Sequence, residues 1–141
     1  MRILGYINYG YRPPAPFVTA VIVLHELSVE ARLPLLLDTG ASNTIVLWGD
    51  IKRIGIDVSS LKPERKFSGL GGLIEAKPIT SIINFRSEKG ELVEEEAEVY
   101  VVTSACIHPK LYLLPSILGR DIINKYALNY NYENGEVYLE K

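Results

Sequence analysis

Short apolar runs separated by glycine, proline, asparagine and serine recur along the whole chain, and no long segment repeats its apolar residues every 3.6 positions. This pattern is typical of a mainly β fold. It predicts strands over Phe17–Leu27, Leu33–Leu37, Thr44–Leu47, Lys66–Ser68, Leu73–Asn84, Leu92–Thr103, Ala127–Tyr132 and Glu136–Glu140. Two segments have a helical pattern instead, Gly49–Ile54 and Arg120–Tyr126.

Residues near the two ends of the chain predict a hairpin turn and an extended arm. Glu133-Asn134-Gly135 stands between two predicted strands and predicts a tight hairpin turn, in which Asn134 and Gly135 supply the positive φ angles. Residues 1–16 contain three prolines near their end and predict an extended arm that leads into the first strand. Because 141 residues suffice for one domain, residues 17–141 are expected to form a single domain.

Composition and charge limit the classes of partner that this chain is expected to bind. The chain has 15 Lys and Arg against 17 Asp and Glu, a balance that argues against a nucleic-acid partner. The longest apolar run is far shorter than the roughly 20 residues that span a bilayer, and the N-terminus lacks the continuous apolar core of a signal peptide. We therefore expect a soluble cytoplasmic protein without a membrane partner. The absence of glutamine and the scarcity of methionine and cysteine suggest a thermophilic source.

Metal and cofactor chemistry has little support in the sequence. A single cysteine, Cys106, excludes an intrachain disulfide and a cysteine-clustered zinc site, and it suits a reducing compartment. His25 and His108 have no partner at ligand spacing. The acidic stretch Glu88–Glu98 is interpreted as the solvated face of a sheet, because Glu94, Glu96 and Glu98 alternate along it. We expect no metal and no cofactor.

The segment that indicates chemistry is Asp38-Thr39-Gly40, directly after the apolar run Leu35–Leu37. A carboxylate at the end of an apolar strand is delivered into a dry site. Such a placement is costly unless the carboxylate is used. Asp38 is therefore a candidate catalytic residue.

Three motifs occur in the order found in one protease family. Asp38-Thr39-Gly40-Ala41 resembles the active-site loop of retropepsin-like aspartic proteases, and Gly69-Leu70-Gly71-Gly72-Leu73-Ile74 resembles their glycine-rich flap tip. Ile117-Leu118-Gly119-Arg120-Asp121 resembles the element that opens their helix. The resemblance covers about residues 33–141. It implies a retropepsin-like closed β-barrel with one short C-terminal helix and a β-hairpin flap.

The resemblance also implies roles for individual residues. Asp38 would be catalytic, Thr39 would hydrogen-bond across paired loops, and Gly40 would let the backbone approach the site. The flap would comprise Ser68, Gly69, Leu70, Gly71, Gly72 and Leu73, and structural support would come from Gly119, Arg120 and Asp121. The cleft would be lined by Leu36, Ala41, Ser42, Asn43, Ile45, Leu70, Pro115 and Ile117, which predicts extended peptide substrates with apolar residues around the cut. Retroviral members tend to have acidic residues where Ser42 and Asn43 stand, so Arg120 would lack its ion-pair partner.

The number of Asp-Thr-Gly motifs predicts the assembly. Hydrolysis by carboxylates needs one ionised and one protonated group, whereas Asp38 is the only aspartate here that Thr-Gly or Ser-Gly follows. A single chain would thus hold half a site, and the resemblance implies a homodimer with Asp38 and its symmetry mate at the two-fold axis. Residues 3–11 and Glu136–Glu140 are the candidate dimer strands.

The leading hypothesis is a homodimeric aspartic endopeptidase. Two alternatives remain open from the sequence. One is a module of the same fold that binds peptides or dimerises without turnover. The other is an all-β domain in which Asp-Thr-Gly is an ordinary turn. Separately, a role as plain core residues stays open for Leu36, Ile45 and Ile117.

Overall fold

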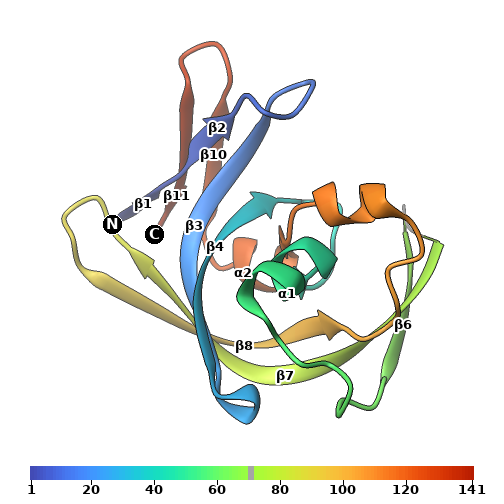
Figure 1. The fold of residues 1–141 in the computed structure, drawn as a ribbon. Helices are drawn as coiled ribbons and strands as arrows, with labels where there is room; N and C mark the ends of the chain where they lie inside the picture. Colours follow the sequence, from blue (N-terminus) through green and yellow to red (C-terminus); the bar gives the residue numbers. More distant parts are fainter. Residues whose placement is uncertain (70–71) are drawn as a thin grey trace.

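A computed structural model describes residues 1–69 and 72–141, so that Leu70 and Gly71 of the expected flap tip lie outside the described residues. The fold is mainly β, as predicted (Figure 1). Its strands are β1 (Arg2–Leu4), β2 (Tyr6–Asn8), β3 (Ala15–Leu24), β4 (Val29–Leu37), β5 (Ile45–Val46), β6 (Arg65–Gly69), β7 (Gly72–Arg86), β8 (Leu92–Val102), β9 (Ile117–Leu118), β10 (Ala127–Asn131) and β11 (Glu136–Glu140). Its α-helices are α1 (Trp48–Ile54) and α2 (Arg120–Ile123), and its 3-10 helices are η1 (His25–Leu27) and η2 (Pro109–Leu113).

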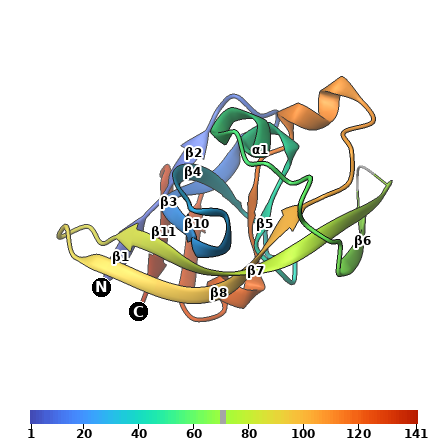
Figure 2. The same ribbon diagram turned by 60° about the horizontal axis from the view of Figure 1, so that its bottom comes forward.

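Strand pairing closes a barrel. The order β3, β4, β9, β5, β8 and β7 returns to β3, because β3 pairs with both β4 and β7. The long strands β7 and β8 run side by side as one curved antiparallel pair (Figure 2). The α2 helix is the short helix that the resemblance implied, and α1 is the additional helix expected from the local pattern.

The core inside the barrel is formed by every second side chain of its strands. Leu33, Leu35 and Leu37 of β4 are buried, whereas the residues between them are more exposed. Ile79 and Ile83 of β7 are fully buried and belong to the same apolar cluster. Because the buried side chains of β4 are packed in this interior, the point at which the following loop begins is held in place.

The first sixteen residues differ from the expected arm because they contain two strands of their own. β1 pairs with β11 and β2 pairs with β3. Ile3 is buried, with 1% of its surface exposed, so the hydrophobic effect holds this segment on its own chain. In the three-stranded sheet β1-β11-β10, β11 has a strand neighbour on both sides. Contrary to our expectation, Glu136–Glu140 has no free backbone edge to offer a second copy.

Several element boundaries differ from the predictions. The strand expected over Phe17–Leu27 ends at Leu24, where η1 begins, and the helix expected over Arg120–Tyr126 ends at Ile123. The expected tight turn is a four-residue loop, since Asn131 pairs with Glu136. Gly135 has a φ of 68°, whereas Asn134 does not have a positive φ.

The acidic strand β8 has the predicted exposed face. Glu94, Glu96 and Glu98 are exposed. Glu95 points the other way and is buried, where its carboxylate accepts hydrogen bonds from Tyr126 (2.6 Å) and Lys125 (3.0 Å). Among the described residues, no cluster of three or more His, Cys, Asp or Glu side chains could hold a metal ion. No helix of residues 1–69 and 72–141 is long and apolar enough to cross a membrane.

Candidate active site

Asp38 follows the last residue of β4, and the neighbouring strand β9 sets its position. Leu36 and Leu37 pair with Ile117 and Leu118 in parallel register. The Asp38 amide then donates to the carbonyl of Leu118 (3.1 Å). The apolar strand that the sequence placed before Asp38 is thus held by a strand from the last third of the chain.

The loop from Asp38 to Thr44 rests on α2. Thr44 is fully buried, and both its amide and its hydroxyl donate to the carboxylate of Asp121 (3.1 and 2.9 Å). The same hydroxyl accepts a hydrogen bond from the amide of Gly119 (3.2 Å). The Arg120 amide donates to the carbonyl of Ala41 (2.9 Å). Every one of these contacts joins segments that are far apart in sequence, so the loop is shaped by the fold as a whole.

Two of the expected support residues act through the backbone of this loop. A Cβ at position 119 would lie 2.5 Å from the backbone of Asn43, so only glycine allows the two segments to pack this closely. The Arg120 guanidinium donates to the carbonyl of Thr39 (2.8 Å). Arg120 thus contacts the loop that carries Asp38 through the backbone carbonyl of Thr39.

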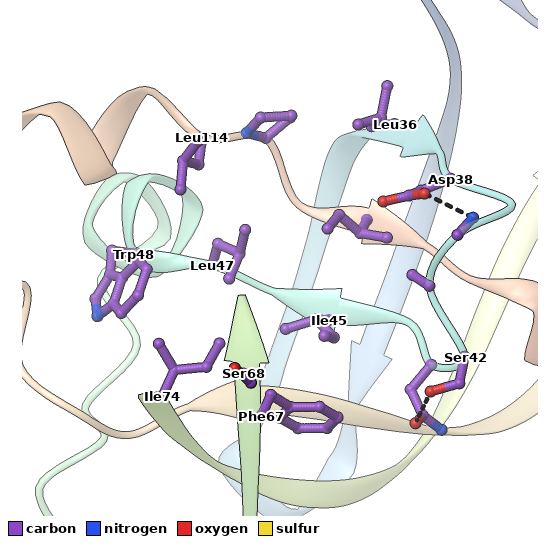
Figure 3. Close-up of a pocket in the computed structure, with 15 residues that line it drawn as sticks. Leu36, Asp38, Ser42, Ile45, Leu47, Trp48, Phe67, Ser68, Ile74 and Leu114 are labelled. Atoms are coloured by element: carbon purple, nitrogen blue, oxygen red, sulfur yellow. Dashed lines mark hydrogen bonds between the residues drawn. The ribbon is translucent and has the colours of Figure 1, made fainter. Parts of the chain in front are cut away.

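The Asp38 carboxylate is only partly shielded in a single chain. One of its oxygens accepts a hydrogen bond from the amide of Gly40 (2.9 Å; Figure 3). Asp38 is half-buried, and Thr39 and Gly40 are exposed. The described residues of one chain therefore do not enclose Asp38 in the dry site that we expected from the sequence.

A cavity of about 380 Å³ opens beside Asp38. Of the expected cleft residues, it is lined by Leu36, Ala41, Ser42, Asn43, Ile45, Pro115 and Ile117, together with Gly40 and the flap residue Ser68. Leu70 lies outside the described residues. The lining is largely apolar at one end and carries the Asp38 carboxylate at the other (Figure 3). This shape suits a ligand with an apolar side chain next to a polar group.

Sequence reasoning missed five apolar residues of the cavity wall: Leu47, Trp48, Phe67, Ile74 and Leu114. They come from the end of β5, from α1, from the hairpin β6–β7 and from the segment before β9. The indole N–H of Trp48 donates to the carbonyl of Ser104 (2.8 Å), which fixes the ring. The signal that could have found Trp48 was a single tryptophan directly after the strand that follows the Asp-Thr-Gly loop.

The hairpin β6–β7 carries the described part of the expected flap. Ser68 pairs with Leu73 and Gly69 with Gly72, and Gly72 has a φ of 84° that favours glycine. Leu73 is 65% exposed. At the base of the hairpin, Arg65 donates to the hydroxyl of Tyr100 (3.0 Å). The hairpin therefore extends from the barrel with an exposed apolar residue near its end.

Comparisons with known proteins agree with this architecture. Residues 26–122 match the profile of the family described as aspartyl protease. The crystal structure of a retropepsin-like aspartic protease from Rickettsia conorii superposes with a TM-score of 0.61 at 17% sequence identity, covering 99% of this chain and 98% of that chain. EIAV protease complexed with the inhibitor HBY-793 gives a TM-score of 0.42 at 21% identity, over 79% of this chain and 86% of that chain. A search of curated proteins finds no significant match. The family profile spans more than half of the chain, and together with the fold it shows that this protein belongs to the aspartyl protease family with a retropepsin-like fold.

Proposed function

We propose that this protein is a homodimeric aspartic endopeptidase in which Asp38 and the Asp38 of a second copy activate the water that hydrolyses a peptide bond. The observation that carries the proposal is the position of Asp38. It lies at the polar end of a largely apolar cavity of about 380 Å³, on a loop held by Thr44 and Asp121, and it stays half-exposed in one chain. A second carboxylate on the exposed side of Asp38 would shield Asp38 from water. It would also supply the second carboxyl group that hydrolysis needs.

Two adjacent carboxyl groups divide the chemical work. Like charges a few ångströms apart cannot both ionise, so the pair holds one proton. The ionised Asp38 takes a proton from the attacking water, and the protonated partner donates its proton to the carbonyl oxygen of the scissile bond. As the C–N bond breaks, Asp38 gives the proton that it took from the water to the leaving amine, and the partner carboxylate takes a proton back from a hydroxyl of the tetrahedral intermediate, which restores the pair. Because the two carboxyl groups are coupled, the two pKa values of their titration describe the pair and not either residue alone.

The cavity lining favours peptides with apolar residues around the cut. Phe67 and Ile74 enter the cavity from the hairpin β6–β7, and Leu36 and Ile117 come from the opposite wall. The hairpin acts as the flap, which closes over an extended peptide and excludes water. Thr39 is exposed beside Asp38, where it is free to hydrogen-bond to the loop of the second copy.

The dimer contact includes the catalytic loops themselves. Because β11 has neighbours on both sides, the backbone edges that remain in its sheet are the outer edges of β1 and β10. In this assembly residues 17–141 form the protease domain, and residues 1–16 contribute β1 and β2 to its sheets.

The test is the Asp38→Asn variant, which keeps the shape of the side chain but cannot ionise. It should abolish cleavage of an apolar peptide at mildly acidic pH while its elution in size-exclusion chromatography stays that of the wild-type dimer. Asp57→Asn is the matched control, since Asp57 lies on an exposed loop away from the cavity, and it should cleave normally. Cleavage by Asp38→Asn at the wild-type rate would refute the proposal.

A further inference from the structure

Ser116 stands between two residues of the cavity wall, Pro115 and Ile117, although its own side chain does not line the cavity. It has no exposed surface. Its carbonyl accepts a hydrogen bond from the amide of Leu36 (2.9 Å), which also lines the cavity. A buried hydroxyl is costly without partners, so the partners of Ser116 Oγ show what it holds in place.

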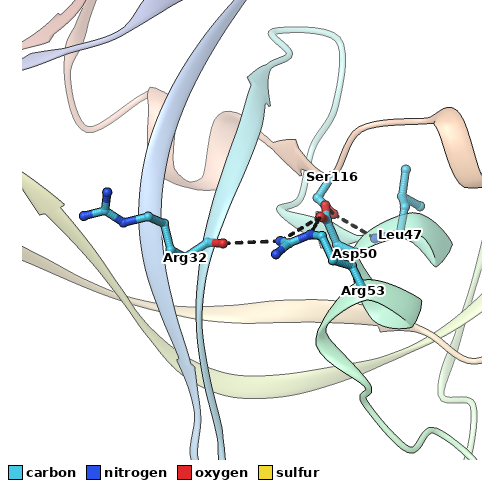
Figure 4. Close-up of polar contacts among 5 residues, drawn as sticks. All are labelled: Arg32, Leu47, Asp50, Arg53 and Ser116. Carbon is cyan, nitrogen blue, oxygen red and sulfur yellow. Dashed lines mark hydrogen bonds and ion pairs between the residues drawn. The ribbon is translucent and has the colours of Figure 1, made fainter.

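The Ser116 hydroxyl joins the start of α1 to the wall of the cavity. It accepts a hydrogen bond from the amide of Leu47 (3.0 Å) and donates to Oδ2 of Asp50 (2.6 Å; Figure 4). Leu47 lines the cavity, and Trp48 directly after it does so too. A single buried side chain thus fixes the segment at 115–117 against the two residues that form the far end of the cavity.

Asp50 extends this connection to β4. Its side chain is 13% exposed, and its other oxygen accepts from Nε (3.3 Å) and Nη2 (3.1 Å) of Arg53 (Figure 4). Nη2 of Arg53 also donates to the carbonyl of Arg32 in β4 (3.3 Å). The continuous set of hydrogen bonds joins β4, α1 and the segment before β9, and each of these elements contributes residues to the cavity wall.

We propose that the hydrogen bond between Ser116 and Asp50 fixes the distance between the cavity walls. This distance determines which apolar side chain of a peptide fits into the cavity. The inference rests on the proposed function, because it assigns a specificity role at the same site. Neither residue touches the substrate. Protein interiors are closely packed, so a small shift of Leu47 and Pro115 changes the space available. One methylene group in an apolar pocket changes selectivity by about tenfold or more.

Ser116→Ala tests this positioning role, and Ser59→Ala is its matched control. Ser59 also donates to an aspartate at 2.6 Å, Asp57, but on an exposed loop away from the cavity. For peptides with a large apolar residue at the cut, Ser116→Ala should raise KM about threefold to tenfold while kcat changes by less than about twofold. Ser59→Ala should change neither constant. A fall in kcat with KM unchanged would overturn the inference.

A second measurement does not depend on cleavage. The Leu47 amide should exchange its hydrogen faster in Ser116→Ala than in the wild type or in Ser59→Ala, because its acceptor is gone. Trp48 is the single tryptophan of the chain, so its fluorescence follows the binding of a statine-type inhibitor in the cavity, and this binding should weaken. Asp50→Asn keeps the side-chain shape but weakens the hydrogen bond from Ser116, so it should likewise weaken inhibitor binding, and it replaces Ser116→Ala where that variant folds poorly.

The outcomes separate the two proposals. A wild-type protein that cleaves, with Leu47 exchange and inhibitor affinity unchanged in both variants, would refute the positioning role and leave the protease proposal standing. A wild-type protein that does not cleave would refute the protease proposal, while the exchange rate of Leu47 would still decide whether Ser116 holds the wall.

Discussion

Thr44 shows how much the loop that carries Asp38 depends on single side chains. It is fully buried, donates to Asp121 and accepts from Gly119. Valine has nearly the same shape but no hydroxyl, so Thr44→Val would leave the buried Gly119 amide without its acceptor and would remove one hydrogen bond to the Asp121 carboxylate. We expect the free energy of unfolding to fall by about 1–3 kcal/mol, measured by urea denaturation. Cleavage should weaken as well, because the loop that carries Asp38 loosens.

The control for this change lies on β3. Thr19 is exposed, so Thr19→Val should change the free energy of unfolding by less than about 0.5 kcal/mol and leave cleavage unchanged. Equal effects of the two substitutions would show that the hydroxyl of Thr44 does not hold the loop.

The residue-level predictions from the sequence succeeded where the motif itself lies beside the cavity. Asp38, Ala41, Ser42 and Asn43 all line it, and they are neighbours in sequence. Phe67 and Leu114 were missed, because they reach the cavity only when the hairpin and the segment before β9 pack around it. The partners of Ser116 were missed for the same reason.

At the scale of elements, Glu95 joins β8 to the turn that follows α2 and to Lys141. Its buried carboxylate accepts from Tyr126 and Lys125, and Lys141 lies 3.7 Å away. Burial would raise the pKa of Glu95, but these hydrogen bonds and positive charges outweigh it and hold the pKa below its ordinary value. Burial and the hydrogen bond to Glu95 raise the pKa of Tyr126.

The lowered pKa of Glu95 gives a stability prediction with a definite sign. Its contribution is fully present above the unfolded-state pKa of about 4.3, and it is lost as the pH falls through the lower folded-state value. Glu95→Gln should therefore unfold more easily at pH 7, by about 1–3 kcal/mol, and its difference from the wild type should shrink at acidic pH. Urea denaturation at several pH values measures both effects.

Glu98→Gln is the control on the exposed face of the same strand, and it should leave stability nearly unchanged at every pH. A difference between Glu95→Gln and the wild type that grows toward acidic pH would contradict the assigned direction.

Strands with a repeated local pattern were predictable from the sequence. The long runs of β7 and β8 were found to within a few residues, because many positions repeat the strand period. The two-residue strand β9 was missed, since its parallel pairing with β4 comes from barrel closure and not from a local pattern. The strands β1 and β2 within the first sixteen residues were not predicted, because each has only three residues and the partner of β1 lies near residue 140.

At the scale of the whole molecule, the proposed dimer predicts that an inactive copy suppresses an active one. When equal amounts of wild type and Asp38→Asn exchange subunits, about one quarter of the dimers keep two intact Asp38 residues. Activity per wild-type chain should then fall by about half, and further with excess variant. Peptide cleavage after mixing measures this effect.

Asp57→Asn added in the same amount should not suppress the wild type, because it retains Asp38. If Asp38→Asn also leaves the activity per wild-type chain unchanged after full subunit exchange, each chain works alone and the shared site is wrong.

The contacts between the Asp38 loop and α2 also constrain the order in which the molecule becomes competent. Thr44 and Asp121 are 77 positions apart, so the loop that carries Asp38 cannot take its final shape before most of the chain has been synthesised. Contacts of such long range form slowly, since much chain must be ordered first. A nascent or truncated chain that ends before Asp121 therefore carries its complete Asp-Thr-Gly motif in an unformed loop, and it stays inactive while the remainder is made.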